Sequence, residues 1–130
     1  MSDSNSCGVA MRPEEAVAAA EALLASGPVT EAKCRMAAHA CYTAALHLAA
    51  PFAGVDVGRD PERDRKVREA MRTSRFTGTP PAHILVLANY FEDLARLRLH
   101  ADHWPGLPFG PDHAGQALEW MRAVLSVMPR

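Results

Sequence analysis

Long apolar runs are missing from this 130-residue sequence, and no stretch approaches the roughly 20 apolar residues that a membrane-spanning helix requires. The first residues contain no basic segment followed by an apolar one, so we expect no secretory signal. Cysteine is scarce as well, and the three cysteines have no paired spacing, which argues against a disulfide framework. These absences predict a cytoplasmic protein that has no membrane association.

An excess of charge of one sign is missing too. Lys and Arg number 14 against 15 Asp and Glu, so the net charge of −1 gives no general attraction to nucleic acid. Hydrophobic residues make up 48% and charged residues 22%, as is usual for globular proteins, and the length fits one domain. We expect a disordered polar tail over residues 1–11 and a single domain over residues 12–130.

Signature motifs of cofactor and metal enzymes are also absent. The sequence has no phosphate-binding loop, dinucleotide fingerprint or nucleophile elbow, so we expect no cofactor. It has no Glu-x-x-His pair of the kind that binds metals in helical bundles, and Cys34 and Cys41 lack the spacing of a metal or redox pair. We therefore expect two small buried thiols and no metal site.

Helical periodicity begins early in the chain. Pro13 and the two glutamates after it predict the start of a first helix that continues to Ala25. Thr30 is a suitable N-cap for a second helix, which we expect to end at about Ala50 because Pro51 follows. The polar residues of this second helix recur every four positions and form one narrow stripe: Glu31, Arg35, His39, Thr43 and His47. Most of its other residues are small or apolar, which is typical of a helix enclosed by others.

Three further helices are predicted. A short charged helix, capped by Asp60, covers residues 61–72; a long helix covers 82–103; and the last covers 111–128. No strand-like alternation occurs, so the expected fold is an all-α, up-and-down bundle of four main helices plus the short charged one. Seven of the 14 basic residues lie between positions 59 and 75, either as a solvated face or as a weak phosphate-attracting patch.

The expected helix over 82–103 has two stripes of interest. Each helical residue turns by about 100°, which places Arg98 on the apolar stripe. Asp102, four residues later, can pair with it, and a charge on an apolar stripe needs such a partner. This pair has either a structural or a functional role.

The second stripe of this helix combines a cation with imidazoles. Arg96 lies between His100 and His103 on the helical wheel, with His103 only about 20° away. An arginine can hold a phosphate, and a histidine can take or give a proton near neutral pH. The same residues can equally be an ordinary charged surface.

Three segments resemble a known family, the HEPN domains (higher eukaryotes and prokaryotes nucleotide-binding). Residues 37–50, AAHACYTAALHLAA, are similar to the family's "raYYaafhaa" helix. Residues 94–103, LARLRLHADH, resemble its "l..lR..aDY" segment, and Pro111-Asp112-His113-Ala114 resembles the start of its final "t.eeA" helix. The order and spacing of the helices fit over roughly residues 12–128.

The resemblance implies a small all-α domain, usually a homodimer. Many HEPN domains are metal-independent endoribonucleases, and bacterial ones are often toxins paired with a nucleotidyltransferase. Active members carry an arginine followed after four to six residues by a histidine. Arg98 and His103 have four residues between them, while Arg96 and His103 have six, so both arginines fit. The candidate catalytic residues are therefore Arg96, Arg98 and His103.

The same resemblance makes His100, Asp102 and Tyr42 candidate substrate-binding residues for RNA or a nucleotide. In the expected reaction His103 removes the proton of a 2′-hydroxyl and the arginine stabilises charge on the phosphate. The alternative is a non-catalytic dimeric module that binds a nucleotide or a protein partner. In that case the pair of Arg98 and Asp102 belongs to the scaffold.

Overall fold

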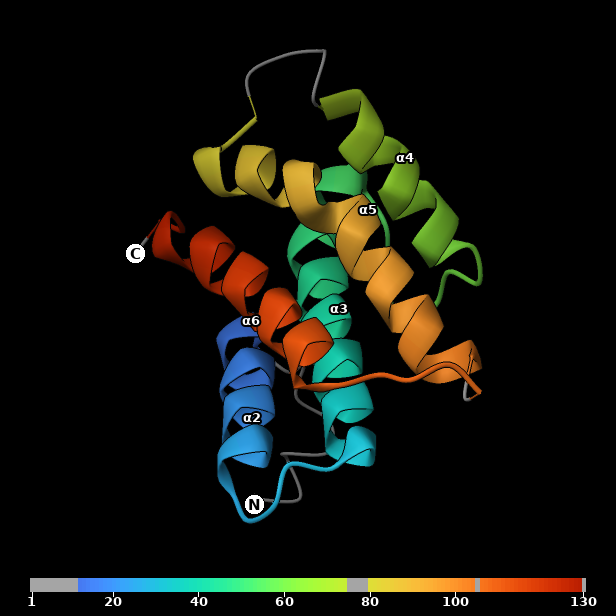
Figure 1. Cartoon of the computed structure of the whole chain (residues 1–130). Helices are drawn as coiled ribbons and strands as arrows, with labels where there is room; N and C mark the ends of the chain where they lie inside the picture. Colours follow the sequence, from blue (N-terminus) through green and yellow to red (C-terminus); the bar gives the residue numbers. More distant parts are fainter. Residues whose placement is uncertain (1–11, 75–79, 105, 130) are drawn as a thin grey trace, which may run out of the picture.

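The computed structural model describes residues 12–74, 80–104 and 106–129. These residues form five helices and no strand, which confirms the all-α bundle (Figure 1). The expected tail over residues 1–11 lies outside the described residues. The helices are α2 (Pro13–Ala25), α3 (Glu31–Ala53), α4 (Arg63–Ser74), α5 (Ala82–His103) and α6 (Pro111–Ser126).

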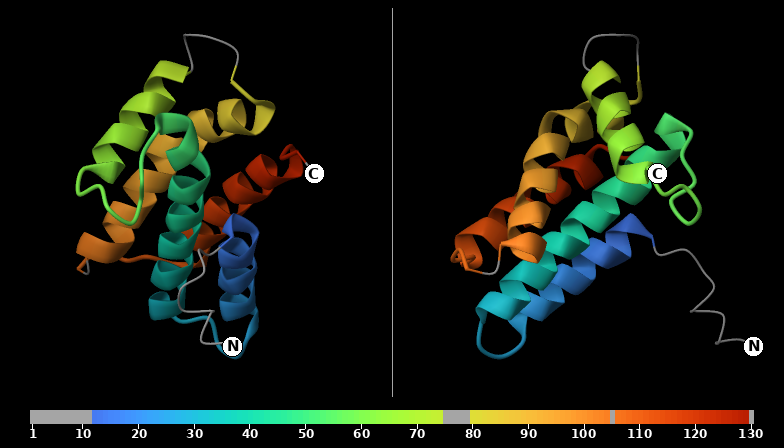
Figure 2. Two further views of the ribbon diagram at one scale, coloured as in Figure 1. Left: turned by 180° about the vertical axis from the view of Figure 1, so that it is seen from behind. Right: turned by 90° about the vertical axis from the view of Figure 1, so that its right-hand side faces the viewer.

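Helix α3 is the centre of the bundle and packs against α2, α4, α5 and α6. Figure 2 shows it from behind, with α2 along one side and α4 on the other. Its alanines explain how it accommodates so many neighbours: Ala37, Ala45 and Ala49 are each 0% exposed. A methyl side chain allows a neighbouring helix to approach closely, so the prediction of an enclosed helix is confirmed.

Helix α3 begins at the predicted residue but ends later than predicted. At its start the Thr30 hydroxyl accepts a hydrogen bond from the backbone N–H of Lys33 at 3.2 Å, as expected of an N-cap. The expected end at Ala50 is wrong, because the helix continues through Pro51 to Ala53. Proline removes only one backbone donor, which is tolerable in the last turn. Gly54 ends the helix in the left-handed conformation, with φ of +70°.

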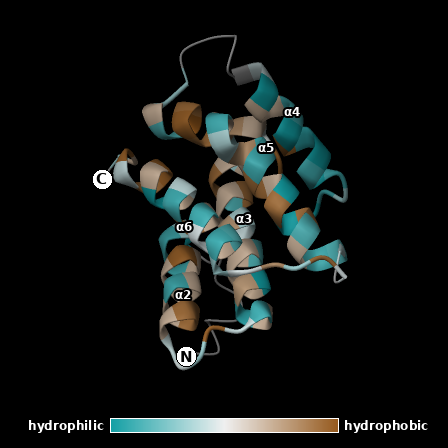
Figure 3. Cartoon of the chain, viewed as in Figure 1, coloured by the Kyte–Doolittle hydropathy of each residue, from teal (hydrophilic) through white to brown (hydrophobic). Residues whose placement is uncertain are grey.

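Helix α4 is the short charged helix, and it is the most hydrophilic of the bundle (Figure 3). It begins at Arg63 rather than at Pro61, because the Asp60 side chain accepts from the N–H of Glu62 and holds a turn before the helix. Val67 and Met71 are buried and anchor α4 to the bundle. Its charged residues are thus fixed in place above α3 and α5.

The last two helices are close to expectation. Helix α5 has the predicted bounds, while α6 ends at Ser126, two residues before the predicted end. None of the described helices combines the length and apolarity that crossing a membrane requires.

The two cysteines of α3 are buried and not cross-linked, as the sequence predicted. Burial raises the pKa of the Cys41 thiol to about 12, so this thiol stays protonated and unreactive near neutral pH.

Candidate functional site

Arg98 is the centre of the candidate site. It projects from the half-buried side of α5, and its guanidinium lies over the ring of Tyr42 on α3, 4.9 Å from the ring centroid. Its side chain is 22% exposed. This position follows from the sequence pattern, because the aliphatic stem continues the apolar stripe of α5 and the charged head extends beyond it.

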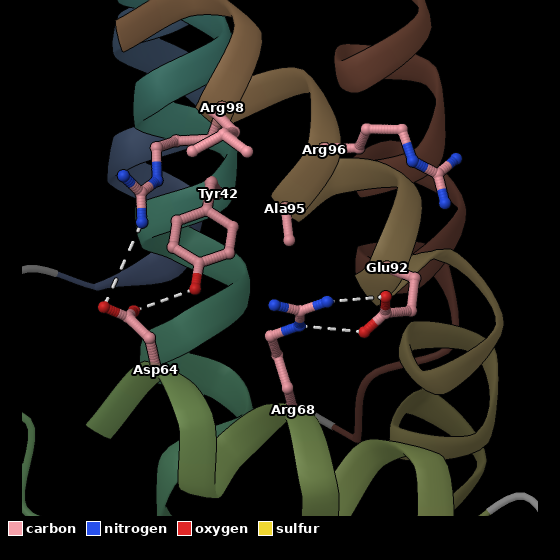
Figure 4. A pocket seen from close by; sticks show the side chains of 8 residues that line it. Tyr42, Asp64, Arg68, Glu92, Ala95, Arg96 and Arg98 are labelled. Carbon is pink, nitrogen blue, oxygen red and sulfur yellow. Dashed lines mark hydrogen bonds and ion pairs between the residues drawn. The ribbon is translucent and has the colours of Figure 1, made fainter. Parts of the chain in front are cut away.

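Carboxylates from two helices face the Arg98 guanidinium. Asp102 on α5 lies 3.7 Å from Nη1, and Asp64 on α4 lies 4.0 Å from Nη2. Asp64 also accepts a hydrogen bond of 2.8 Å from the hydroxyl of Tyr42 (Figure 4). Three helices therefore meet at one cation, and the predicted pair of Arg98 and Asp102 is confirmed. The Nε atom of Arg98 is buried and has no hydrogen-bond partner in the described part of the chain.

His103 at the end of α5 contacts the same guanidinium. Its Nε2 atom is 3.3 Å from Nη1 of Arg98. A guanidinium can only donate, so Nε2 of His103 is the acceptor in a hydrogen bond between these two groups. The structure thus brings together the arginine and the histidine that are separated by four residues.

Arg96 is not part of this cluster. Its side chain is 68% exposed, bonds to Asp93 at 3.1 Å and turns away from Tyr42 and Arg98 (Figure 4). The helical wheel favoured Arg96 as the neighbour of His103, yet the recorded contact is with Arg98. Arg98 and His103 stand about 140° apart on an ideal wheel. The long arginine side chain bridges that gap along the last turn of α5.

His39 is a site residue that sequence reasoning missed. Its Nδ1 atom lies 2.8 Å from Oδ2 of Asp102, so one carboxylate joins His39 to Arg98. The available signal was the polar stripe of α3, which faces the end of α5. Arg35, on the same stripe, donates hydrogen bonds to the backbone carbonyls of His100 and Ala101 and so fixes that end.

His100 belongs to a different cluster. Its ring packs edge-on against Phe109 at 5.0 Å and His113 at 5.3 Å, and its buried Nε2 has no partner in the described part of the chain. Of the six predicted site residues, the structure therefore gathers Tyr42, Arg98, Asp102 and His103. His100 lies in a separate cluster, and Arg96 shares a pocket lining with Tyr42 and Arg98 but forms its ion pair with Asp93.

A pocket of about 220 Å³ opens beside this cluster, between α4 and α5. One wall is an ion pair in which Arg68 donates two hydrogen bonds of 2.9 Å to the Glu92 carboxylate (Figure 4). Arg72 approaches the same carboxylate at 3.4 Å. The hydrogen bonds from Arg68 lower the pKa of Glu92 to about 2, so the wall is fully charged near neutral pH. The pocket lining comprises Tyr42, Asp64, Arg68, Glu92, Ala95, Arg96, Arg98 and Leu99.

A second pocket, of about 320 Å³, shares part of this lining. Tyr42, Asp64 and Arg98 line both pockets. The remaining lining of the second pocket comes from α3, the start of α4 and the segment between them: His39, Thr43, Leu46, His47, Val57 and Arg63. Arg98 can therefore be reached from two pockets.

No group of three or more His, Cys, Asp or Glu residues suited to a metal ion occurs within the described ranges. Comparison of the chain with family models, with curated proteins and with solved structures finds no match.

Proposed function

We propose that this protein is a HEPN-like domain that cleaves RNA without a metal ion at a centre formed by Arg98 and His103. The observation that carries the proposal is the 3.3 Å contact between these two side chains, of which Arg98 lines a pocket. Arginine supplies several fixed donors for a phosphate, and histidine transfers protons near neutral pH. The spacing of the two residues also fits the family that the sequence resembles.

The reaction is an attack of a ribose 2′-oxygen on the neighbouring phosphorus. His103 accepts the 2′-hydroxyl proton, the new oxygen–phosphorus bond forms, and the bond from phosphorus to the 5′-oxygen breaks. The products are a 2′,3′-cyclic phosphate and a 5′-hydroxyl, whose proton comes from an acid or from water. Arg98 stabilises the negative charge that grows on the phosphate.

The arrangement of the free protein suits a resting state for this chemistry. The Nε2 atom of His103 faces the Arg98 guanidinium, and a lone pair that accepts from this guanidinium is not available as a base. An anionic phosphate competes with the imidazole for the guanidinium because charge-assisted hydrogen bonds are the stronger ones. Binding of a phosphate to Arg98 would therefore release His103 for proton transfer.

The proposal includes the partners that the resemblance implies. They are a second copy of the chain, which forms a homodimer, and a nucleotidyltransferase that pairs with this protein as in bacterial toxin–antitoxin systems. A dimer that faces its two Arg98 clusters toward one groove would offer two histidines to one RNA.

The test is incubation of the purified protein with total RNA in EDTA, beside His103→Ala. The expected result is cleavage by the wild type, with 2′,3′-cyclic phosphate ends, and loss of about 100-fold or more in rate for the variant. Far-ultraviolet circular dichroism checks that both proteins are folded. RNA profiles that are identical with and without the wild-type protein would contradict the proposal.

A non-catalytic binding module is the second candidate. It is favoured by the charge compensation at Arg98, where two carboxylates within 4.0 Å and an aromatic face already surround the cation. In that case the cluster is scaffold, and the protein binds a nucleotide or a protein partner elsewhere. Binding of RNA or nucleotides with no cleavage in the same incubation would support this candidate.

A further inference from the structure

The second pocket contains polar groups that the candidate cleavage site does not use. It lies beside the polar stripe of α3, and Arg63 at the start of α4 also lines it. His47 and the hydroxyl of Thr43 have no hydrogen bond within the described part of the chain. Arg63 has one hydrogen bond there, of 3.5 Å, from its guanidinium to the backbone carbonyl of Asp60.

The charges around this pocket favour an anion. Arg63 and Arg98 contribute two positive charges, and Asp64 contributes one negative charge that is shared with Tyr42 and Arg98. The lining itself therefore carries a net charge of +1, and Asp102, which is not part of the lining, pairs with Arg98 and His39 beside it.

We propose that this pocket binds a terminal phosphate, either as free phosphate or as the phosphomonoester of a small molecule. The donors come from three helices and number at least four: the guanidinium groups of Arg63 and Arg98, the hydroxyl of Thr43 and the imidazole of His47. Such a set matches a tetrahedral oxyanion with several acceptor oxygens better than a carboxylate with two. This binding does not depend on RNA cleavage, because it needs no proton transfer by His103.

The size of the pocket limits what the phosphate can carry. Its volume of about 320 Å³ is at the lower end of the roughly 300–1,000 Å³ that is usual for small-molecule sites. A phosphate with a small organic group fits this volume. The ligand class that we propose is therefore a small phosphorylated molecule.

Arg63 and Arg65 provide a charge-matched test. Both belong to α4, but only Arg63 lines the pocket; Arg65 is 57% exposed and pairs with Glu62 and Glu69. Purified wild-type protein, Arg63→Gln and Arg65→Gln are titrated with inorganic phosphate and, separately, with ribose 5-phosphate by calorimetry. His47→Gln provides an independent second variant on α3.

The expected result is saturable binding to the wild type, weakened about tenfold by Arg63→Gln and by His47→Gln and unchanged by Arg65→Gln. Tighter binding of ribose 5-phosphate than of phosphate would identify a phosphomonoester as the ligand, and equal binding would show that only the phosphate is recognised. No saturable binding to the wild type, or equal effects of the two arginine variants, would overturn the proposal. RNA cleavage by the same proteins is measured in a separate assay. A lack of cleavage would therefore contradict the proposed function but not the proposed phosphate binding.

Discussion

At the scale of single residues, the structure is organised around a charge that would be costly to bury alone. Side chains from three helices, which are far apart in the sequence, surround the Arg98 guanidinium with two carboxylates and one aromatic ring. The partner on its own helix, Asp102, was predictable because four residues make one turn. Asp64 was not, since nothing in the local pattern separates it from the other acids of a uniformly charged segment.

The ionisation of the Tyr42 hydroxyl provides a test of the contacts around Arg98. Burial and the Asp64 carboxylate raise the pKa of Tyr42 well above its ordinary value. The pKa of a tyrosine in the unfolded chain is about 10, so the folded state binds the Tyr42 proton more tightly than the unfolded state does. The resulting stabilisation is complete below about pH 10 and is lost as the pH rises further. Urea unfolding is expected to show a fall in the free energy of unfolding above about pH 10. Tyr42→Phe should lower stability by about 1–2 kcal/mol at pH 7 and weaken that alkaline fall.

If Tyr42→Phe leaves both the stability at pH 7 and the fall in the free energy of unfolding above about pH 10 unchanged, the hydrogen bond to Asp64 is contradicted. Tyr90→Phe is a suitable control, because the Tyr90 ring stacks on Trp120 outside the Arg98 cluster.

Glu92 gives the matching effect in acid. The hydrogen bonds of Arg68 lower its pKa from 4.5 to about 2, so its contribution is complete above about pH 4.5 and is lost as the pH falls toward 2. Glu92→Gln should therefore reduce stability near neutral pH by about 1 kcal/mol, a small value because the pair is partly exposed. Thermal unfolding from pH 7 to pH 2.5 measures this. Parallel curves for wild type and variant across that range would argue against the ion pair.

At the scale of the helices, local sequence signals predicted most of the first and last residues of the helices. Thr30 at the start of α3 and the prolines at the starts of α2 and α6 have the positions that their chemistry predicts. The predicted end of α3 before Pro51 was wrong, because a proline in the last turn removes one backbone donor without breaking the helix. Helix propensity does not predict which helices pack against each other, so the position of α4 over Tyr42 is known only from the structure.

The packing of α3 depends on small side chains. Ala45 is 0% exposed at the centre of α3, and a larger residue there would push a neighbouring helix away. Ala45→Leu is expected to cost about 1–3 kcal/mol in the free energy of unfolding. Ala32→Leu, an exposed position on the same helix, should change stability by less than about 0.5 kcal/mol. Equal stability of the two variants in urea would show that α3 is not tightly enclosed.

At the scale of the whole molecule, composition and periodicity were sufficient for the all-α class and for the five helices of the described residues. They were not sufficient for the site, because four of its residues, His39, Tyr42, Asp64 and Arg98, come from three helices. The chain as a whole carries a net charge of −1, so any attraction for RNA or phosphate must come from local groups such as those around Arg98. The proposed activity thus depends on one cluster and not on the general surface.

The most direct test of that claim compares two arginines that are two residues apart. Initial rates of RNA cleavage in EDTA are measured for the wild type, Arg98→Ala and Arg96→Ala, each shown to be folded by circular dichroism. The account predicts a loss of about 100-fold or more for Arg98→Ala, as for removal of a donor to a developing charge. It predicts a much smaller loss, of about tenfold at most, for Arg96→Ala, because Arg96 lines the pocket but is exposed and pairs with Asp93. A large loss from Arg96→Ala with retained activity of Arg98→Ala would contradict it.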